Sequence, residues 1–185
     1  DFSAEIFELG PASEKSGWMV GDRVAGTIHD ACGVCQQCVE GRYNLCENYG
    51  VMDLHRQYGH NYQGADAEYV VHGVKCIFPL PESVSWEEGA VIDPASIALH
   101  CARRGKVKPG DDVVIMGAGP VGLLAGDAAL AMGAGRVIVV GRGPRLAKAR
   151  AMGFTGVDSN AVEVVDAIRE LTAGRGADVI IEAAG

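Results

Sequence analysis

The fold of this chain is constrained most by a glycine-rich loop that lies within a regular alternation of strands and helices after residue 111. Residues 113–116 are wholly apolar, as expected of a parallel strand buried on both faces. The sequence GAGPVG follows, and apolar residues then recur at helical spacing. This order predicts an α/β fold with a parallel sheet and right-handed crossovers. Further strands are expected at 137–140, 154–157 and 178–181, and helices at 145–152 and 161–172, the last with Val164, Val165, Ile168 and Leu171 facing the core.

A GxGxxG loop between a buried strand and a helix predicts a dinucleotide-binding site. Gly117 permits a tight turn, Gly119 lets the backbone approach a pyrophosphate, and Gly122 lets the helix pack closely on the strand. The helix start, at Pro120 and Val121, would present unpaired N–H groups and a positive dipole end to the phosphates. The alternative is a plain strand–helix turn that binds nothing.

The end of the second strand of the sheet indicates which dinucleotide is bound. NAD sites carry an acid there, which hydrogen-bonds the ribose 2′-hydroxyl. This chain has Gly141, Arg142 and Arg145 and no acid. A guanidinium binds a 2′-phosphate bidentately, so the sequence favours NADP over NAD. The alternative is that both arginines are solvated loop residues.

The first half of the chain is β-rich. Extended segments are expected over residues 2–10, 23–28 and 67–80. Ser85 suits a helix N-cap, and Pro94 predicts two short helices or one kinked helix. The expected organisation is a β-rich domain over 1–92, a helical connection over 93–110 and the dinucleotide-binding domain over 111–185.

Four cysteines lie close together between these extended segments, with the spacing Cys-x2-Cys-x2-Cys-x7-Cys. Four thiolates at this spacing can surround one zinc ion and fill every position, which is typical of a structural site. Gly33 and Gly41 would allow the tight turns that such a lobe over residues 32–46 requires. Disulfides are the alternative. The expected ligands are Cys32, Cys35, Cys38 and Cys46.

Composition excludes several classes of partner. The net charge is −8 and no basic stripe is present, so nucleic acid is not expected to bind. No apolar run approaches the length of a membrane span, and no secretion signal is visible, so a cytoplasmic location is expected. In a reducing compartment the cysteines favour metal over disulfides. The five histidines show no metal-ligand spacing, and His60 is expected to be a surface residue.

Taken together, these motifs resemble the zinc-containing medium-chain dehydrogenase/reductase (alcohol dehydrogenase) family, and its sorbitol and threonine dehydrogenase-like members in particular. The family's GDRV, AEYV and LP motifs also match, at residues 21–24, 67–70 and 80–81. The resemblance implies a GroES-like catalytic domain and a Rossmann domain with a doubly wound parallel sheet. It further implies a fragment, in which the first domain lacks its N-terminus and the second its last strands.

The resemblance also implies a catalytic zinc, whose first two ligands, a cysteine and a histidine, would precede residue 1. Asp93 lies in the family's third ligand position, where Asp-Pro-Ala replaces Glu-Pro-Leu. It is the expected catalytic residue and would touch zinc directly or through a water; the alternative is a helix-capping acid. Asp1 lies where some members place an acidic ligand, and the alternative there is a chain end without a role.

The implied function is an NAD(P)-dependent alcohol or polyol dehydrogenase that transfers hydride between a secondary alcohol, or its ketone, and the cofactor. Its partners would be a small-molecule alcohol or carbonyl substrate and its own copies, in a homodimer or homotetramer. The fragment alone is expected to be inactive. The alternative is a non-enzymatic dinucleotide-binding redox sensor that keeps a structural zinc lobe.

Overall fold

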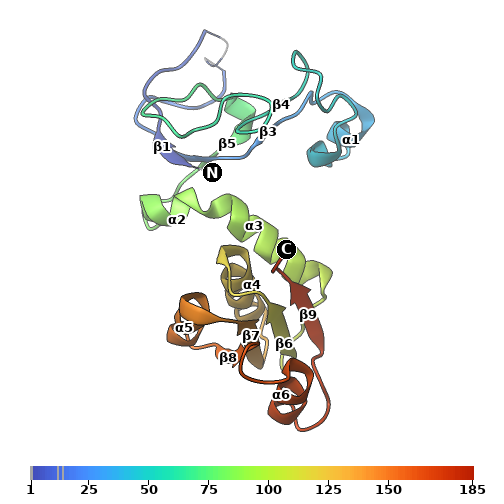
Figure 1. Cartoon of the computed structure of the whole chain (residues 1–185). Helices are drawn as coiled ribbons and strands as arrows, with labels where there is room; N and C mark the ends of the chain where they lie inside the picture. The colour runs from blue at the N-terminus through green and yellow to red at the C-terminus, as the bar shows by residue number, and fades with distance from the viewer. Residues whose placement is uncertain (1, 12, 14) are drawn as a thin grey trace. The chain divides into compact units, whose positions relative to one another are not determined.

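The computed structural model describes residues 2–11, 13 and 15–185, and the chain divides into two compact units, Asp1–Asp93 and Pro94–Gly185. Each unit has its own sheet (Figure 1). Within the described residues, no helix is both long enough and apolar enough to cross a membrane.

The first unit is built on a three-stranded antiparallel sheet in the order β1-β2-β5. These strands are β1 (Ser3–Glu5), β2 (Arg23–Gly26) and β5 (Ile77–Pro79). The central strand β2 pairs with both neighbours and is the most buried of the three, with Val24 and Ala25 almost fully enclosed. A second, two-stranded sheet pairs β3 (His29–Asp30) with β4 (Arg56–Gln57).

The prediction of an extended segment over residues 67–80 is wrong for residues 67–73. Residues 67–73 form no strand, and a 3-10 turn, η2 (Val74–Cys76), precedes the short β5. Tyr69 and Val71 are 68% and 86% exposed. These residues are of types that favour strands, but they have neither a neighbouring strand nor a buried face to stabilise one. The cysteine segment contains two short helical turns, α1 (Gln36–Val39) and the 3-10 turn η1 (Tyr43–Leu45).

The helices near residue 90 agree with the prediction from Ser85 and Pro94. The Ser85 hydroxyl accepts from the Glu88 N–H at 3.1 Å, and the Glu88 carboxylate accepts from the Ser85 N–H at 2.8 Å. This capping box begins α2 (Trp86–Ala90). A second helix, α3 (Ile92–Arg104), follows after Val91 and has Pro94 in its first turn, where proline is tolerated.

The second unit is a four-stranded parallel sheet in the order β8-β7-β6-β9, which confirms the predicted doubly wound fold. The chain starts in the middle at β6, adds β7 and β8 on one side, and then crosses to add β9 on the other. The strands are β6 (Asp112–Met116), β7 (Arg136–Gly141), β8 (Thr155–Asp158) and β9 (Val179–Glu182), and the helices between them are α4 (Pro120–Ala131), α5 (Gly143–Ala151) and α6 (Val164–Leu171).

Both faces of this sheet are buried. Val113 and Ile115 lie in one core with residues of α3, α4 and α5, whereas Val114 lies in a second core with residues of α6. The prediction that Val165 faces the core is wrong, because it is 53% exposed. Ala167 packs against the second core, together with Val164, Ile168 and Leu171 as expected.

Candidate functional site

The glycine loop lies at the carboxyl end of β6, the point where the strand order reverses between β7 and β9. Ligands of doubly wound sheets bind at such a switch point. Gly117 has φ +111°, which is unfavourable for other residues, and a Cβ there would lie 2.7 Å from the Ala183 carbonyl oxygen. The predicted tight turn is therefore present, and it also brings the chain after β9 against the loop.

The next two glycines of the loop differ in their surroundings. A Cβ at Gly122 would lie 2.0 Å from the Gly117 carbonyl oxygen and 3.2 Å from Ile115, so only glycine lets α4 pack this closely on the strand. At Gly119, by contrast, a Cβ would meet nothing within 4 Å. Gly119 is the N-cap of α4, its residue type supplies no capping side chain, and Pro120 follows in the first turn. The N–H groups at this helix start are open to an anion.

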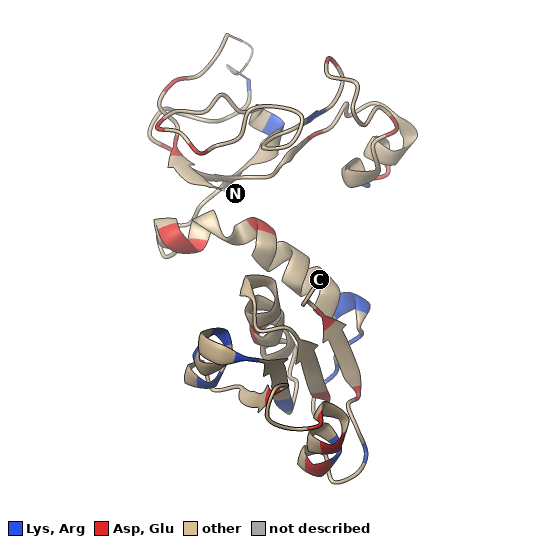
Figure 2. Cartoon of the chain, viewed as in Figure 1, with Lys and Arg blue, Asp and Glu red and all other residues tan. Residues whose placement is uncertain are grey.

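The residues that would select the cofactor follow β7, next to the glycine loop. The strands β6 and β7 are parallel neighbours, with Met116 opposite Val140, so their carboxyl ends share one edge. Arg142 is the N-cap of α5, and it and Arg145 are exposed. Neither forms an ion pair with any residue that the structure describes. The charged residues of α5 are basic, whereas α6 carries both acidic and basic residues (Figure 2).

Gly141 has a structural reason that the sequence did not indicate. A Cβ at this position would lie 2.8 Å from the Ala118 Cβ of the glycine loop. The end of β7 therefore packs directly on the loop, and a larger residue would push the two apart. Glycine at position 141 therefore allows β7 to pack on the glycine loop, and this role is separate from any space that it leaves for a ribose phosphate.

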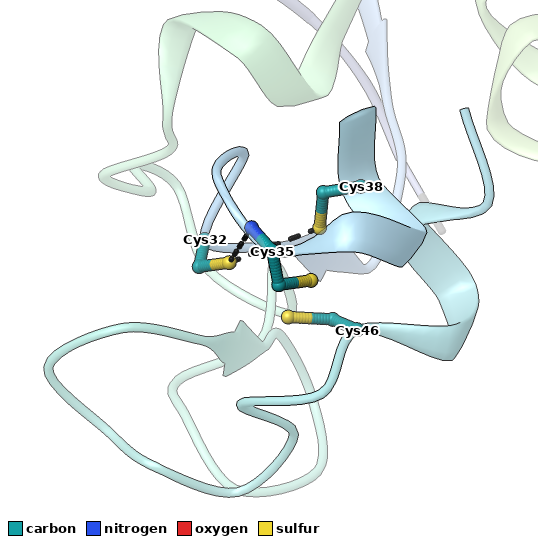
Figure 3. A group of neighbouring side chains, drawn as sticks. All are labelled: Cys32, Cys35, Cys38 and Cys46. Carbon is teal, nitrogen blue, oxygen red and sulfur yellow. Dashed lines mark hydrogen bonds between the residues drawn. The ribbon is translucent and has the colours of Figure 1, made fainter. Parts of the chain in front are cut away.

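The four cysteines form one cluster in the first unit, with their sulfur atoms pointing toward a common centre (Figure 3). The four Sγ atoms lie within 4.8 Å of one another. Four thiolates on one zinc at about 2.3 Å lie roughly 3.8 Å apart, so the cluster needs little contraction to hold the ion. Gly33 and Gly41 have φ of +76° and +80°, the turns that the spacing requires.

The electrostatics of the cluster also suit a cation. The Val34 N–H, the Asn48 side chain and the Cys35 N–H lower the pKa of Cys32 to about 6. Desolvation and the neighbouring thiols raise the pKa of Cys38 to about 12. Four adjacent thiols cannot all ionise alone, because each thiolate opposes the next. A divalent ion would remove that opposition, so the donor set and its geometry fit zinc.

Asp93 lies in the first turn of α3 and is half-buried. It is the second residue of the helix rather than its N-cap, and an acid in the first turn interacts favourably with the helix dipole. The charge of Asp93 also acts on His29. The pKa of His29 is lowered, mainly by burial and next by the charge of His55. The carboxylate of Asp93 acts in the opposite direction, and His60 makes a smaller contribution that lowers the pKa. Asp1, the other expected acid, lies outside the described residues.

The sequence interpretation missed two residues of this region, His29 and His55. Their ring centroids are 5.8 Å apart, although 26 positions separate them in the sequence. The Nδ1 atom of His29 and both ring nitrogens of His55 are enclosed without a hydrogen-bond partner. No motif or spacing could have indicated this pair, since the contact exists only because the loop after the cysteine cluster folds back on β3. His60 is exposed, in agreement with the prediction.

The chain thus combines a β-rich unit that carries a four-thiol cluster with a unit of the Rossmann type. The alcohol dehydrogenase GroES-like domain model matches residues 1–82, and the zinc-binding dehydrogenase model matches residues 120–185. The chain belongs to the zinc-containing medium-chain alcohol dehydrogenase family, as its motifs predicted.

Among curated relatives, sorbitol dehydrogenase of Bacillus subtilis (strain 168) is 40% identical over 185 residues, which cover 99% of this chain and 50% of that protein. L-threonine 3-dehydrogenase of Idiomarina loihiensis is 40% identical over 188 residues, with 100% of this chain and 52% of that protein covered. The chain thus spans about half the length of the relatives it matches.

Solved structures share the fold over the whole chain. A structure of the zinc-binding dehydrogenase class from Sinorhizobium meliloti 1021, bound to NADP, has a TM-score of 0.86 and 34% identity, and the match covers 100% of this chain and 53% of that one. An alcohol dehydrogenase structure from Escherichia coli CFT073, complexed with NADH, has a TM-score of 0.84 and 28% identity, with 100% and 52% covered.

Proposed function

We propose that the protein carrying this chain is a zinc-dependent alcohol or polyol dehydrogenase that transfers hydride between a secondary alcohol, or its ketone, and NAD(P), with NADP preferred. The observation that carries the proposal is the glycine loop at the switch point of the sheet, in a chain of this family. The sorbitol and threonine dehydrogenases among the relatives support a substrate with a CH–OH group.

The second unit would bind the cofactor. The open backbone at Gly119 and the start of α4 would hold the pyrophosphate, since helix N–H groups bind anions without a further charge. Arg142 and Arg145, both exposed, would bind the 2′-phosphate of NADP. Family structures bound to NADP and to NADH both exist, so the arginines are the reason for the stated preference.

The first unit would bind both zinc ions. Cys32, Cys35, Cys38 and Cys46 would hold the structural zinc, which keeps the lobe folded and leaves no position for substrate. Asp93 would contribute to the catalytic site, directly or through a water, and would orient the substrate oxygen there. A bound catalytic zinc supplies Lewis acidity, which lowers the pKa of the alcohol and so favours hydride departure from its carbon.

Metal and rate measurements on the full-length gene product test the proposal. We expect two zinc ions per subunit, and Asp93→Ala should retain the structural ion while alcohol oxidation is lost. Initial rates with sorbitol or xylitol should be higher with NADP than with NAD. One zinc per subunit, with cofactor binding but no turnover, would instead favour the redox sensor. Light scattering would read out the expected homodimer or homotetramer.

A further inference from the structure

The strand β8 is an outer strand of the parallel sheet in the second unit. It pairs with β7 on one side, and no described strand pairs with its other side. In a doubly wound sheet the third strand in chain order keeps this position, because later strands are added at the opposite side of the sheet. An outer strand presents backbone groups that can pair with a strand of another molecule. The free edge of β8 is therefore a surface at which a second molecule could add a strand.

Two carbonyl groups of β8 face this free edge. The Ser159 N–H donates to the last residue of β7 at 3.1 Å, and alternate residues of a strand bond to opposite sides, so Gly156 and Asp158 point away from β7. The turn after the strand closes one of the two carbonyls, because the N–H groups of Ala161 and Val162 donate to the Asp158 oxygen at 3.1 and 3.3 Å. The Gly156 carbonyl has no such partner in the turn.

The Gly156 carbonyl is closed instead by a side chain, the guanidinium of Arg150 in the last turn of α5. Its Nη2 donates to this oxygen at 3.0 Å, and Arg150 forms no ion pair with any residue that the structure describes. The side chain lies directly over the strand, because a Cβ at Gly156 would lie 2.6 Å from the Nε and 2.8 Å from the Cγ of Arg150. Glycine at position 156 therefore provides the space that the arginine occupies.

The same two residues line an open groove along the strand, to which α5 and α6 both contribute. Most of its other lining is apolar and includes Val157, Val162, Ala167 and Leu171. An edge with free backbone groups and pockets for side chains favours the addition of a strand. A charged side chain placed on the edge disfavours it, and natural sheets use such charges to avoid pairing with one another.

We propose that Arg150 closes the β8 edge against strand addition by a second copy of this chain. A second copy is the relevant partner because its β8 carries the same edge and the same apolar groove, and a twofold interface brings one surface against itself. Strand addition would need the Gly156 carbonyl, which Arg150 occupies, and would bury the guanidinium, which costs free energy. The inference does not depend on the proposed dehydrogenase function.

Two substitutions in the full-length protein open the edge by different routes. Arg150→Ala removes the guanidinium, whereas Gly156→Ala keeps it but displaces it from the strand, because the new methyl group would take its place. Light scattering over a concentration series measures association. Both variants should associate beyond the wild-type oligomer at a protein concentration at least roughly tenfold lower than the wild type needs, because the freed carbonyl can accept an intermolecular hydrogen bond.

Lys148→Ala is the matched control. Lys148 lies on the same helix and is exposed, but it does not line the groove, so this variant should associate no more than the wild type. Removing one cation from a chain of net charge −8 makes the chain more negative, so general charge repulsion would oppose association in all these variants that lose a cation. Arg150→Lys keeps a charged donor at the edge and should associate less than Arg150→Ala.

Hydrogen exchange identifies the contact that forms. In associated Arg150→Ala, the N–H groups of Gly156 and Asp158 should exchange more slowly than in the wild type, since they face the added strand. Unchanged exchange at both positions would assign the association to another surface and overturn the inference.

The remaining outcomes are equally decisive. Wild-type association in both Arg150→Ala and Gly156→Ala, with retained melting temperatures, overturns the inference. A smaller oligomer in Arg150→Ala than in the wild type overturns it too, since Arg150 would then stabilise an interface. Equal association in Lys148→Ala assigns the effect to charge alone and has the same consequence. Where one variant fails to fold, as its melting temperature shows, the other variant and Arg150→Lys decide.

Discussion

Replacing Gly122 with alanine should destabilise the Rossmann unit, because the new methyl group has no room. Its carbon would lie 2.0 Å from the Gly117 carbonyl oxygen, whereas an ordinary carbon–oxygen contact is about 3.3 Å or longer. The obstructing atom is backbone and belongs to the tight turn, so the turn or the start of α4 must move. Overpacking costs about 1–3 kcal/mol, and the better helix propensity of alanine offsets about 1 kcal/mol. We expect a net loss of about 1 kcal/mol, and at most about 2 kcal/mol, in the free energy of unfolding.

Gly119→Ala is the matched control, since it adds the same methyl group to the same loop. No atom lies within 4 Å of its Cβ, and its φ of −78° is ordinary for any residue. Stability should change by less than about 1 kcal/mol. The methyl group would nevertheless occupy the open backbone surface that the pyrophosphate is expected to approach, so NADPH should bind at least roughly tenfold more weakly.

Urea unfolding and NADPH fluorescence titration of the full-length protein measure the two effects. The two variants should show opposite patterns: loss of stability in Gly122→Ala, and loss of cofactor affinity with retained stability in Gly119→Ala. Unchanged NADPH affinity in Gly119→Ala would show that the loop does not contact the cofactor. Unchanged stability in Gly122→Ala would refute the packing argument.

The remaining predictions concern charge, metal and capping. Arg142→Ala should weaken NADPH binding about tenfold and leave NADH unchanged, as measured by titration with each cofactor; equal changes would refute its role. Cys46→Ser should remove one zinc per subunit, seen by metal analysis, and promote unfolding of the lobe, seen as faster proteolysis there. Asp112→Asn should destabilise the second unit by about 1–3 kcal/mol in urea, because this buried carboxylate pairs with Arg136 at 3.3 Å and with Arg175 at 2.7 Å. The Ser85 N–H and hydroxyl lower the pKa of Glu88 in the folded state. The ionised Glu88 carboxylate therefore stabilises the fold above the pKa that it has in the unfolded chain, and this stabilisation is lost as the pH falls through its lower pKa in the folded state. The melting temperatures of wild type and Glu88→Gln should therefore differ at pH 7 and converge in acid.

Much of the architecture could be read from the sequence because its signals are local. A wholly apolar run, a glycine loop and a helical period each report on a few neighbouring residues, and together they predicted the strands and helices of the parallel sheet. The same holds for Ser85, whose hydroxyl and Glu88 partner lie one helical turn apart. The prediction was wrong at residues 67–73 because a strand also needs a partner, which the residues themselves cannot indicate.

The sequence by itself determined the family, the parallel sheet with its glycine loop, and the four cysteines as a group, because each of these depends on residue types at fixed, short spacings. Only the tertiary structure decided which residues of distant segments meet. It packed Gly141 on Ala118 and enclosed His55 beside His29. The physical reason is that burial and unsatisfied hydrogen bonds belong to the packed chain as a whole, and no local pattern encodes them.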